Sequence, residues 1–390
     1  MVNSRLEQLT AHLKQLAAQL PEGFLPFDVF MNAALYTPHL GYYTATHPVG
    51  SPASGADFIT APEISHLFGY TIAQAILPCF TDDLPVHILE CGAGTGQLAK
   101  DILDAFSDLN ITVKQYDIIE LSSSLRVQQQ ALLINYPCIR WLNELPQTFS
   151  GVVLANELLD ALPVQAFVLQ AGVLYERGVS WNHNQQTWQW VKRLSQASIT
   201  EQNEIINRLP IETRSQAYYE FEYGKQACAW VNSVAACIER GVMIFIDYGF
   251  ANDELYHPQR SGGTLMTHRL HQANTDVLSY VGDADITAHV NFTQAAQAAL
   301  NQGMNITGFV NQARFLINAD IANVFTKTTQ KIQANQVAMA QLSRGLQLLM
   351  SEAEMGELFK VLAVTKHCVS PKGFEQGDRS HRLLERWNKE

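Results

Sequence analysis

The 390-residue chain is poor in positive charge and contains no basic run. Its 26 lysines and arginines are outnumbered by 37 acidic residues, which leaves a formal net charge of −11 at pH 7. Proteins that bind a nucleic-acid backbone generally carry clustered lysine and arginine. The composition therefore argues against nucleic acid as a general partner, whereas an acidic surface favours a basic peptide or a single guanidinium group.

Cysteine pairs and long apolar stretches are also missing. The six cysteines show no C-x-x-C spacing, so the sequence suggests neither a metal site nor a disulfide framework. No apolar run reaches membrane-spanning length, and the N-terminal region has no signal-peptide core. From these absences we expect a cytoplasmic protein without a membrane span.

The chain contains neither the G-x-S-x-G elbow of hydrolases nor a P-loop. It does contain the segment VHILECGAGTGQL at residues 86–98. This segment predicts a short buried strand, a turn with three alternate glycines, and a helix that starts near Leu98. Gln97 stands where the third glycine of a dinucleotide-binding motif would fall, which argues against that class of site.

The glycines of this segment, Gly92, Gly94 and Gly96, follow Glu90 in the pattern E-x-G-x-G-x-G. Small residues let the backbone approach a ligand, and the next helix directs free N–H groups to the same place. A carboxylate at the strand tip suits a ligand with an ammonium group, and S-adenosylmethionine (SAM) carries both an ammonium and a sulfonium. A tight turn needs glycine with or without a ligand, so a purely structural role is the alternative.

Strand and helix patterns alternate along the chain, which predicts an α/β fold with a parallel sheet. Further sheet strands are expected at 116–120, 151–155, 242–250 and 361–366, and helices at 4–20, 123–134, 195–240 and over most of 292–352. Apolar and polar residues alternate over 164–192, which predicts an antiparallel β insertion. The spacing of Thr60 and Glu63 predicts a helix cap, and we favour that role for Glu63 over a catalytic one.

The length of the chain exceeds what one hydrophobic core usually supports, so either two domains or one core with large insertions is expected. We expect an N-terminal helical region with a cofactor-covering loop (1–80), the first half of the core (81–163), a β and helical insertion (164–240), a core strand (241–250), a largely helical insertion on the substrate side (251–340), and a C-terminal helix with the last core strands (341–390).

Polar residues follow the predicted strands at the sheet edge where open α/β sheets bind ligands. Glu120 ends the second strand, where an acid accepts hydrogen bonds from ribose hydroxyls. Asn156, Glu157 and Asp160 follow the strand at 151–155. If their turn is helical, Glu157 and Asp160 share one face and can bind a guanidinium group together. The alternative is an asparagine cap followed by solvated acids.

Four more polar residues are candidates for the same pocket. Asp247 ends the strand at 242–250, and His268, His271 and Asp285 lie in the segment after it. A lone histidine is more often a packing or surface residue than a ligand. Their spacing matches no metal-ligand pattern, so no metal is expected.

Together these segments resemble the MidA-like family of SAM-dependent methyltransferases. The matching segments occur in order over roughly residues 30 to 366 and include DFITAPEISHLFG, ILECGAGTGQLAKDIL, YDIIELSSSLRVQQQ, NELLDALPVQAF, IDYGF, GGTLMTHRLHQANTDVLSYVGDADITAHVNF and MGELFKVLAV. The family usually has a proline within the glycine turn, where this chain has Ala93. This small-for-small change does not threaten binding.

The resemblance implies a class I SAM-dependent methyltransferase, with a Rossmann-like sheet of seven mostly parallel strands, antiparallel last strands, an N-terminal helical region and inserted helices and strands. It implies that Glu90 and the three glycines surround the methionine end of SAM, with Asn156 also among the cofactor-binding residues, and that Glu120 holds the ribose. Asn156, Glu157 and Asp160 would form the rim that faces the methyl acceptor, with the two acids as the catalytic pair.

Relatives in this family include a mitochondrial complex I assembly factor that methylates an arginine. The resemblance therefore implies a protein substrate presenting an arginine, such as a respiratory complex I subunit. We also expect closure of the 44–56 loop to exclude water. Two other interpretations are an assembly factor with little turnover and a small-molecule methyltransferase. The oligomeric state is undetermined, and a homodimer is one option.

Overall fold

The computed structural model describes residues 2–45, 59–269, 272–332 and 335–384. The chain folds into two compact units, each assembled from separate segments. We call them the antiparallel-sheet unit (Met1–Pro48, Leu159–Ala229 and Phe250–Gln294) and the parallel-sheet unit (Val49–Leu158, Trp230–Gly249 and Ala295–Glu390). Among the described residues, no helix combines the length and apolarity needed to cross a bilayer.

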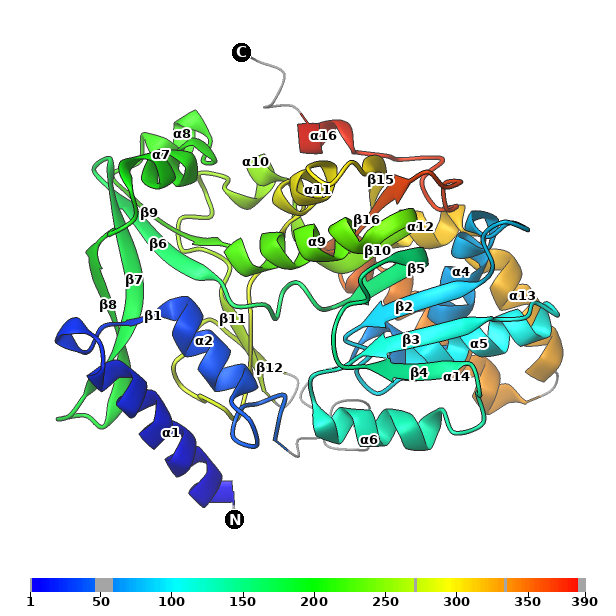
Figure 1. The fold of residues 1–390 in the computed structure, drawn as a ribbon, viewed down its shortest axis with the longest axis horizontal. Coiled ribbons are helices and arrows are strands. Elements are labelled where there is room, and N and C mark those ends of the chain that lie inside the picture. Colours follow the sequence, from blue (N-terminus) through cyan, green and yellow to red (C-terminus); the bar gives the residue numbers. More distant parts are fainter. Residues whose placement is uncertain (1, 46–58, 270–271, 333–334, 385–390) are drawn as a thin grey trace. The chain divides into compact units, whose positions relative to one another are not determined.

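The parallel-sheet unit is built on strands in the spatial order β15-β16-β10-β5-β2-β3-β4. Their bounds are β2 His87–Cys91, β3 Gln115–Ile119, β4 Ile139–Leu142, β5 Phe149–Asn156, β10 Ile238–Phe250, β15 Asn305–Asn311 and β16 Phe359–Lys366. Neighbours from β10 to β4 pair in parallel, whereas β16 runs antiparallel to both β10 and β15. The predicted sheet, with antiparallel pairing at its end, is confirmed (Figure 1).

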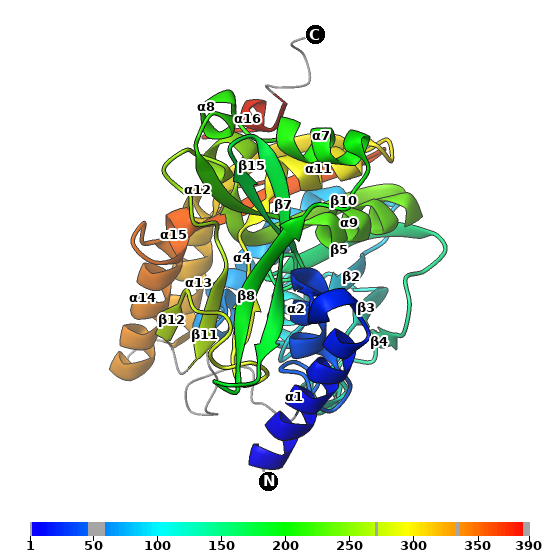
Figure 2. The same cartoon turned by 90° about the vertical axis from the view of Figure 1, so that its left-hand side faces the viewer.

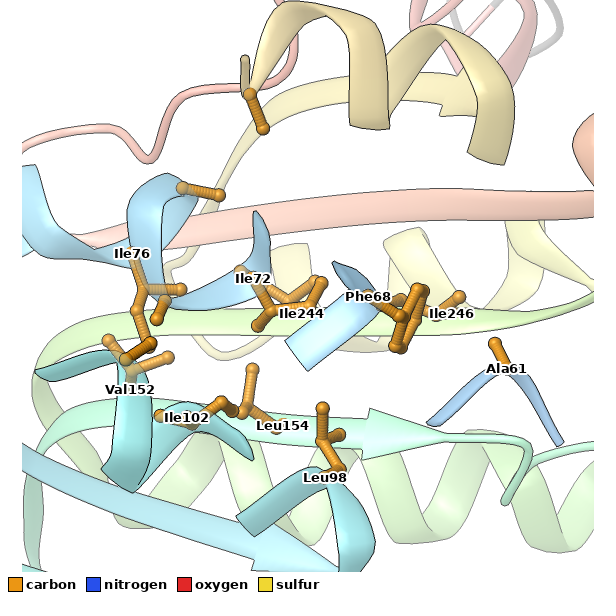
Figure 3. Packing of buried hydrophobic residues seen from close by; sticks show 14 of the residues in the cluster. Ala61, Phe68, Ile72, Ile76, Leu98, Ile102, Val152, Leu154, Ile244 and Ile246 are labelled. Atoms are coloured by element: carbon orange, nitrogen blue, oxygen red, sulfur yellow. The ribbon is translucent and has the colours of Figure 1, made fainter. Parts of the chain in front are cut away.

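Helices cover this sheet and supply its core. Their bounds are α3 Ala61–Ile64, α4 Leu67–Ile76, α5 Gln97–Asp108, α6 Ser123–Leu132, α9 Lys225–Cys237, α11 Phe292–Leu300, α12 Gln312–Asn318, α13 Ile321–Ile332, α14 Gln336–Met350, α15 Met355–Leu358 and α16 His381–Leu384. Phe68 and Ile72 of α4 and Ile102 of α5 pack against Leu154 and Ile244 of the two central strands (Figure 3). Removal of these side chains from water stabilises the layered arrangement.

Two strands lie in segments for which we predicted helix, and both corrections have a tertiary cause. In the 195–240 segment, β9 Tyr218–Tyr223 pairs antiparallel with β6 Gln165–Gln170. In the 292–352 segment, β15 pairs with β16, and its register shifts between Ile306 and Gly308. Gly308 lies against the ring of Phe374, so a distant residue shapes this strand. The spacing of apolar residues within each segment does not reveal the distant strand, β6 or β16, with which β9 or β15 pairs.

The antiparallel-sheet unit contains the predicted β insertion. Its main sheet has the order β1-β7-β6-β9, with β8 paired to β7, and its helices α1 and α2 pack on it (Figure 2). The remaining bounds are α1 Val2–Ala18, β1 Leu25–Pro26, α2 Phe27–Tyr36, β7 Val173–Asn182, β8 Thr187–Leu194, α7 Ile199–Asn207, α8 Ile211–Arg214, α10 Asn252–Leu255, β11 Met266–Arg269, β12 Gln272–Asn274, β13 Asp285–Thr287 and β14 Val290–Asn291. The strands β11, β12 and β13 form a separate small sheet.

Candidate functional site

The turn between β2 and α5 has the backbone that its glycines predict. Gly92, Gly94 and Gly96 have φ values of 71°, 54° and 88°, in the left-handed region that favours glycine. Apart from Gly94 itself and its two chain neighbours, no described residue has an atom within 4 Å of the position that a Cβ on Gly94 would occupy. The backbone at Gly94 therefore borders open space, as a close approach by a ligand requires.

Glu90 lies beneath this turn, within the sheet. Its side chain is buried, with 2% of the residue's surface exposed, and its Oε2 accepts a hydrogen bond of 2.7 Å from the hydroxyl of Tyr116 on β3. Burial raises the pKa of Glu90 to about 7, although the Tyr116 bond acts in the opposite direction. Near neutral pH this carboxyl group can therefore change its charge beneath the glycine turn.

Glu120 follows β3 and lies beside the glycine turn. Its Oε1 accepts from the Ser122 backbone N–H at 2.8 Å, and its Oε2 accepts from Gln129 Nε2 at 3.1 Å. The same Gln129 nitrogen donates to the Gly94 carbonyl oxygen at 2.8 Å. Burial raises the pKa of Glu120, while these hydrogen bonds and the backbone amides of Leu121 and Gly94 favour its charged form. The carboxylate is thus fixed next to the turn.

Asn156 and Glu157 emerge at the carboxyl end of β5. Glu157 has a φ of 51° and its Oε1 accepts from Asn156 Nδ2 at 3.1 Å and from the Ala61 backbone N–H at 3.4 Å. Asn156 Oδ1 is buried and has no hydrogen-bond partner among the described residues. A buried acceptor of this kind is costly unless a donor reaches it. An ammonium group would supply such a donor.

The turn that carries Glu157 and Asp160 is not helical, so the condition under which the two acids would share one helix face is not met. Their role as a catalytic pair stays a prediction. Residues 157–162 form bends and turns without helix, because the backbone at Glu157 is left-handed and its N–H donates to Ile246 O on β10 at 2.9 Å. Asp160 belongs to the antiparallel-sheet unit. There it is buried, and its carbonyl oxygen accepts from the Ala288 N–H at 3.0 Å.

The predicted helix cap at Thr60 is also wrong. Helix α3 begins at Ala61, but the Thr60 side chain makes no capping hydrogen bond. Glu63 instead accepts a hydrogen bond at Oε1 from the hydroxyl of Thr95, inside the glycine turn. Glu63 is therefore a site residue that our sequence analysis assigned to a local role. The only available signal was its acidic charge, because the two residues are far apart in the chain.

The antiparallel-sheet unit holds a cluster of aromatic and acidic side chains. Tyr36 and Tyr43 stack with ring centroids 5.6 Å apart, and the Tyr36 hydroxyl donates to Ala161 O at 2.9 Å. Burial raises the pKa of Tyr43 well above its usual range, and the charges of Asp285 and Asp160 act in the same direction. The structure therefore places two of the candidate acids near one tyrosine.

The other candidates are distributed as follows. His268 on β11 lies opposite Asp285 on β13, and burial lowers the pKa of His268. Asp247 is buried on β10, opposite Lys360 of β16, and its Oδ1 accepts from the Tyr248 N–H at 2.8 Å. His271 and most of the 44–56 loop lie outside the described residues.

The parallel-sheet unit therefore carries a glycine turn that borders open space, a fixed carboxylate on the next strand, and a buried amide oxygen without a described donor. A model of a family of S-adenosyl-L-methionine-dependent methyltransferases matches residues 71–310. The chain belongs to this family. The resemblance inferred from the sequence is confirmed.

Solved structures extend the match to 97% of the chain. A Burkholderia thailandensis protein, named as a candidate methyl transferase and bound to S-adenosyl-homocysteine, is 37% identical with a TM-score of 0.87, and the match covers 97% of each chain. Another crystal structure from the same organism is 37% identical with a TM-score of 0.85 over the same shares. The fold is therefore the class I methyltransferase fold, and the cofactor is SAM.

Curated relatives are more distant. This chain is 28% identical to the Drosophila melanogaster homologue of the mitochondrial protein arginine methyltransferase NDUFAF7. The match covers 90% of this chain and 84% of that protein. The chain is 25% identical to the Homo sapiens protein arginine methyltransferase NDUFAF7, over 87% of this chain and 79% of that protein.

Proposed function

We propose that this SAM-dependent methyltransferase transfers the methyl group to an arginine side chain of a protein. The observation that carries the proposal is the Glu157 carboxylate, held at the carboxyl end of β5 by Asn156 and the Ala61 amide. A carboxylate in that place suits a guanidinium group, which it can bind with charge-assisted hydrogen bonds. The curated relatives named as protein arginine methyltransferases support the same acceptor.

The residues of the parallel-sheet unit fit the cofactor. We propose that Gly94 and its neighbours in the turn approach the methionine portion, that Asn156 Oδ1 accepts from its ammonium group, and that Glu120 holds the ribose hydroxyls. Glu90 would add negative charge beneath the turn. When bound, SAM supplies an activated methyl group on its sulfonium.

The main contribution of the protein to the reaction would be to orient the acceptor toward the methyl group. Glu157 would align a guanidinium nitrogen with the methyl group, since alignment alone accounts for a large part of the rate of such transfers. Asp160, Asp285 and the stacked tyrosines of the antiparallel-sheet unit are acidic and aromatic groups of the kind that bind cations. We propose them, with His268, as contacts for a basic peptide, and the net charge of −11 favours such a substrate.

A labelling experiment tests the acceptor. The purified protein is incubated with tritiated SAM and a cell lysate, and labelled proteins are digested and analysed for methylated arginine by mass spectrometry. Label on arginine supports the proposal, and label on other residues contradicts it. Label only in the low-mass fraction indicates a small-molecule methyltransferase, and no label indicates a binding factor. Four expectations from the sequence stay predictions: a complex I subunit as the substrate, a homodimer as the oligomeric state, the bounds of the six chain segments, and a cytoplasmic location.

A further inference from the structure

Gln129 is the central member of three consecutive glutamines on α6, and its environment differs from that of both neighbours. Gln128 and Gln130 are exposed, whereas Gln129 has 0% of its surface exposed. A fully buried glutamine is uncommon unless its amide is hydrogen-bonded. Here both ends of the amide have partners, and these partners come from three different parts of the parallel-sheet unit.

The direction of the Gln129 amide follows from chemistry. The indole nitrogen of Trp141, on β4, lies 2.9 Å from Gln129 Oε1, and an indole N–H can only donate. The amide oxygen must therefore face Trp141. The Nε2 group then faces two acceptors, the Gly94 carbonyl at 2.8 Å and Glu120 Oε2 at 3.1 Å. Each of its two hydrogens has one acceptor.

We propose that Gln129 is a positioning residue. It would hold the Glu120 carboxylate, which would bind the ribose, at a fixed distance from the glycine turn. One nitrogen joins the residue that would hold the ribose to the backbone that would approach the methionine portion. Both ends of one cofactor molecule must fit at once, so the separation of these two groups sets cofactor affinity. The inference rests on the ribose role proposed for Glu120 and is independent of the methyl acceptor.

Glu120 needs this support because it is a buried carboxylate. Burial disfavours its charged form, and the side-chain donor that opposes this effect is Gln129. Without that donor, backbone amides still hold the carboxylate, but Oε2 loses the hydrogen bond that links it to the Gly94 carbonyl through one nitrogen, and its charged form is less favoured. Loss of a hydrogen bond to a charged group reduces affinity by roughly 10- to 100-fold.

The test uses the purified protein and isothermal titration calorimetry with two ligands, S-adenosyl-homocysteine and its 2′,3′-dideoxy analogue. The dissociation constant of the dideoxy analogue, divided by that of S-adenosyl-homocysteine, reports recognition of the ribose hydroxyls, and we call this quantity the ratio. Gln129→Met keeps the side-chain length and removes both donated hydrogen bonds. We expect the ratio to fall by about 10-fold or more, with most of the loss on the hydroxylated ligand. Because both ligands are measured on one sample, a reduced folded fraction cancels from the ratio.

Gln128→Met and Gln130→Met are matched controls on the same helix, and we expect both to keep the wild-type ratio. Trp141→Phe is the second variant. It removes only the donor that orients the amide, so we expect a smaller fall in the ratio, and it serves if Gln129→Met does not fold. A wild-type ratio in both Gln129→Met and Trp141→Phe overturns the inference, as does an equal fall in the Gln128 or Gln130 variants.

Glu120→Gln separates this inference from the ribose assignment on which it rests. If Glu120→Gln abolishes the preference for the hydroxylated ligand and Gln129→Met preserves it, Glu120 binds the ribose without help and the positioning role is wrong. If Glu120→Gln itself keeps the preference, the ribose assignment is wrong. A fall in both variants, with no further fall when they are combined, is the expected result.

Discussion

Two acids at strand ends of the parallel-sheet unit and two acids in the main sheet of the antiparallel-sheet unit have different partners. In the parallel-sheet unit, Glu90 and Glu120 lie at the carboxyl ends of strands and accept hydrogen bonds from a tyrosine, an amide and the backbone. In the antiparallel-sheet unit, Glu220 and Glu176 pair with arginines: Arg177 Nη1 lies 2.6 Å from Glu220 Oε2, and Arg193 Nη2 lies 2.8 Å from Glu176 Oε2. Neutral donors fix a carboxyl group without adding a counter-charge, whereas an arginine supplies one.

Aromatic rings show the same contrast. Each cation–aromatic contact among the described residues lies in the antiparallel-sheet unit, including Arg177 over Trp190 at 4.1 Å and Lys14 over Trp181 at 3.6 Å. These contacts stabilise a sheet surface. Glu90 and Glu120, by contrast, are held at strand ends by neutral donors, an arrangement that suits a cationic cofactor. We therefore expect substitutions in the parallel-sheet unit to alter cofactor binding separately from substitutions in the antiparallel-sheet unit.

The largest expected effect is on cofactor binding. Gly94→Val forces a β-branched residue into a left-handed backbone and fills the open space beside the turn. We expect SAM affinity to fall by more than about 100-fold, measured by calorimetry. Gly172→Val is the matched control, because Gly172 also has a positive φ, 79°, and open space, but lies in the antiparallel-sheet unit. An equal loss in both variants would remove the contrast between the units.

Next in size is the effect on methyl transfer. Glu157→Gln keeps the acceptor oxygen for Ala61 and removes the charge. We expect the rate of transfer to protein to fall by roughly 100-fold, with SAM affinity within about 3-fold of the wild type. The rate is measured with tritiated SAM. Glu239→Gln, an exposed acid at the amino end of β10, should retain full activity. Full activity in Glu157→Gln would clear Glu157 of its role.

Stability should depend on pH through Glu90. Its pKa is about 7 in the folded protein, against a usual value of 4.5, so the folded state binds more protons between these limits. The free energy of unfolding should therefore decrease as pH rises from about 4.5 to 7, by about 3 kcal/mol, and then level off. Glu90→Gln should remove this part of the slope.

Urea denaturation of both proteins without cofactor, at several pH values, measures the effect. Burial also raises the pKa of Asp101 to about 7, so both proteins share that contribution and the difference between them isolates Glu90. Parallel pH profiles for the two proteins would contradict the assignment.

The smallest expected effect is in the antiparallel-sheet unit. Arg177→Ala removes the ion pair with Glu220 and the contact with Trp190. We expect a loss of about 1–2 kcal/mol of unfolding free energy, measured by denaturant titration, with unchanged SAM affinity. Lys225→Ala breaks an exposed ion pair with Glu201 and should cost less than about 0.5 kcal/mol. A fall in SAM affinity in Arg177→Ala would show that the units are coupled.

Much of the fold could be predicted because its signals are local. The strand at β2, its glycine turn and the start of α5 follow from one short segment, and the alternation over 164–192 predicted β6, β7 and β8. The strands β9 and β15 could not be predicted, since each depends on a partner strand distant in the sequence. β15 also contains Gly308, which is unfavourable in a strand until Phe374 packs against it.

Site residues divide in the same way. The sequence by itself determined the glycine turn and the acids at strand ends, because strand, turn and helix preferences act between neighbouring residues. Only the tertiary structure decided which groups those residues contact: Thr95 with Glu63, and Trp141 with Gln129. A side-chain hydrogen bond needs its two groups to lie within a few ångströms in space, but they can be any number of residues apart in the sequence. Its partners can therefore be identified only in the folded chain.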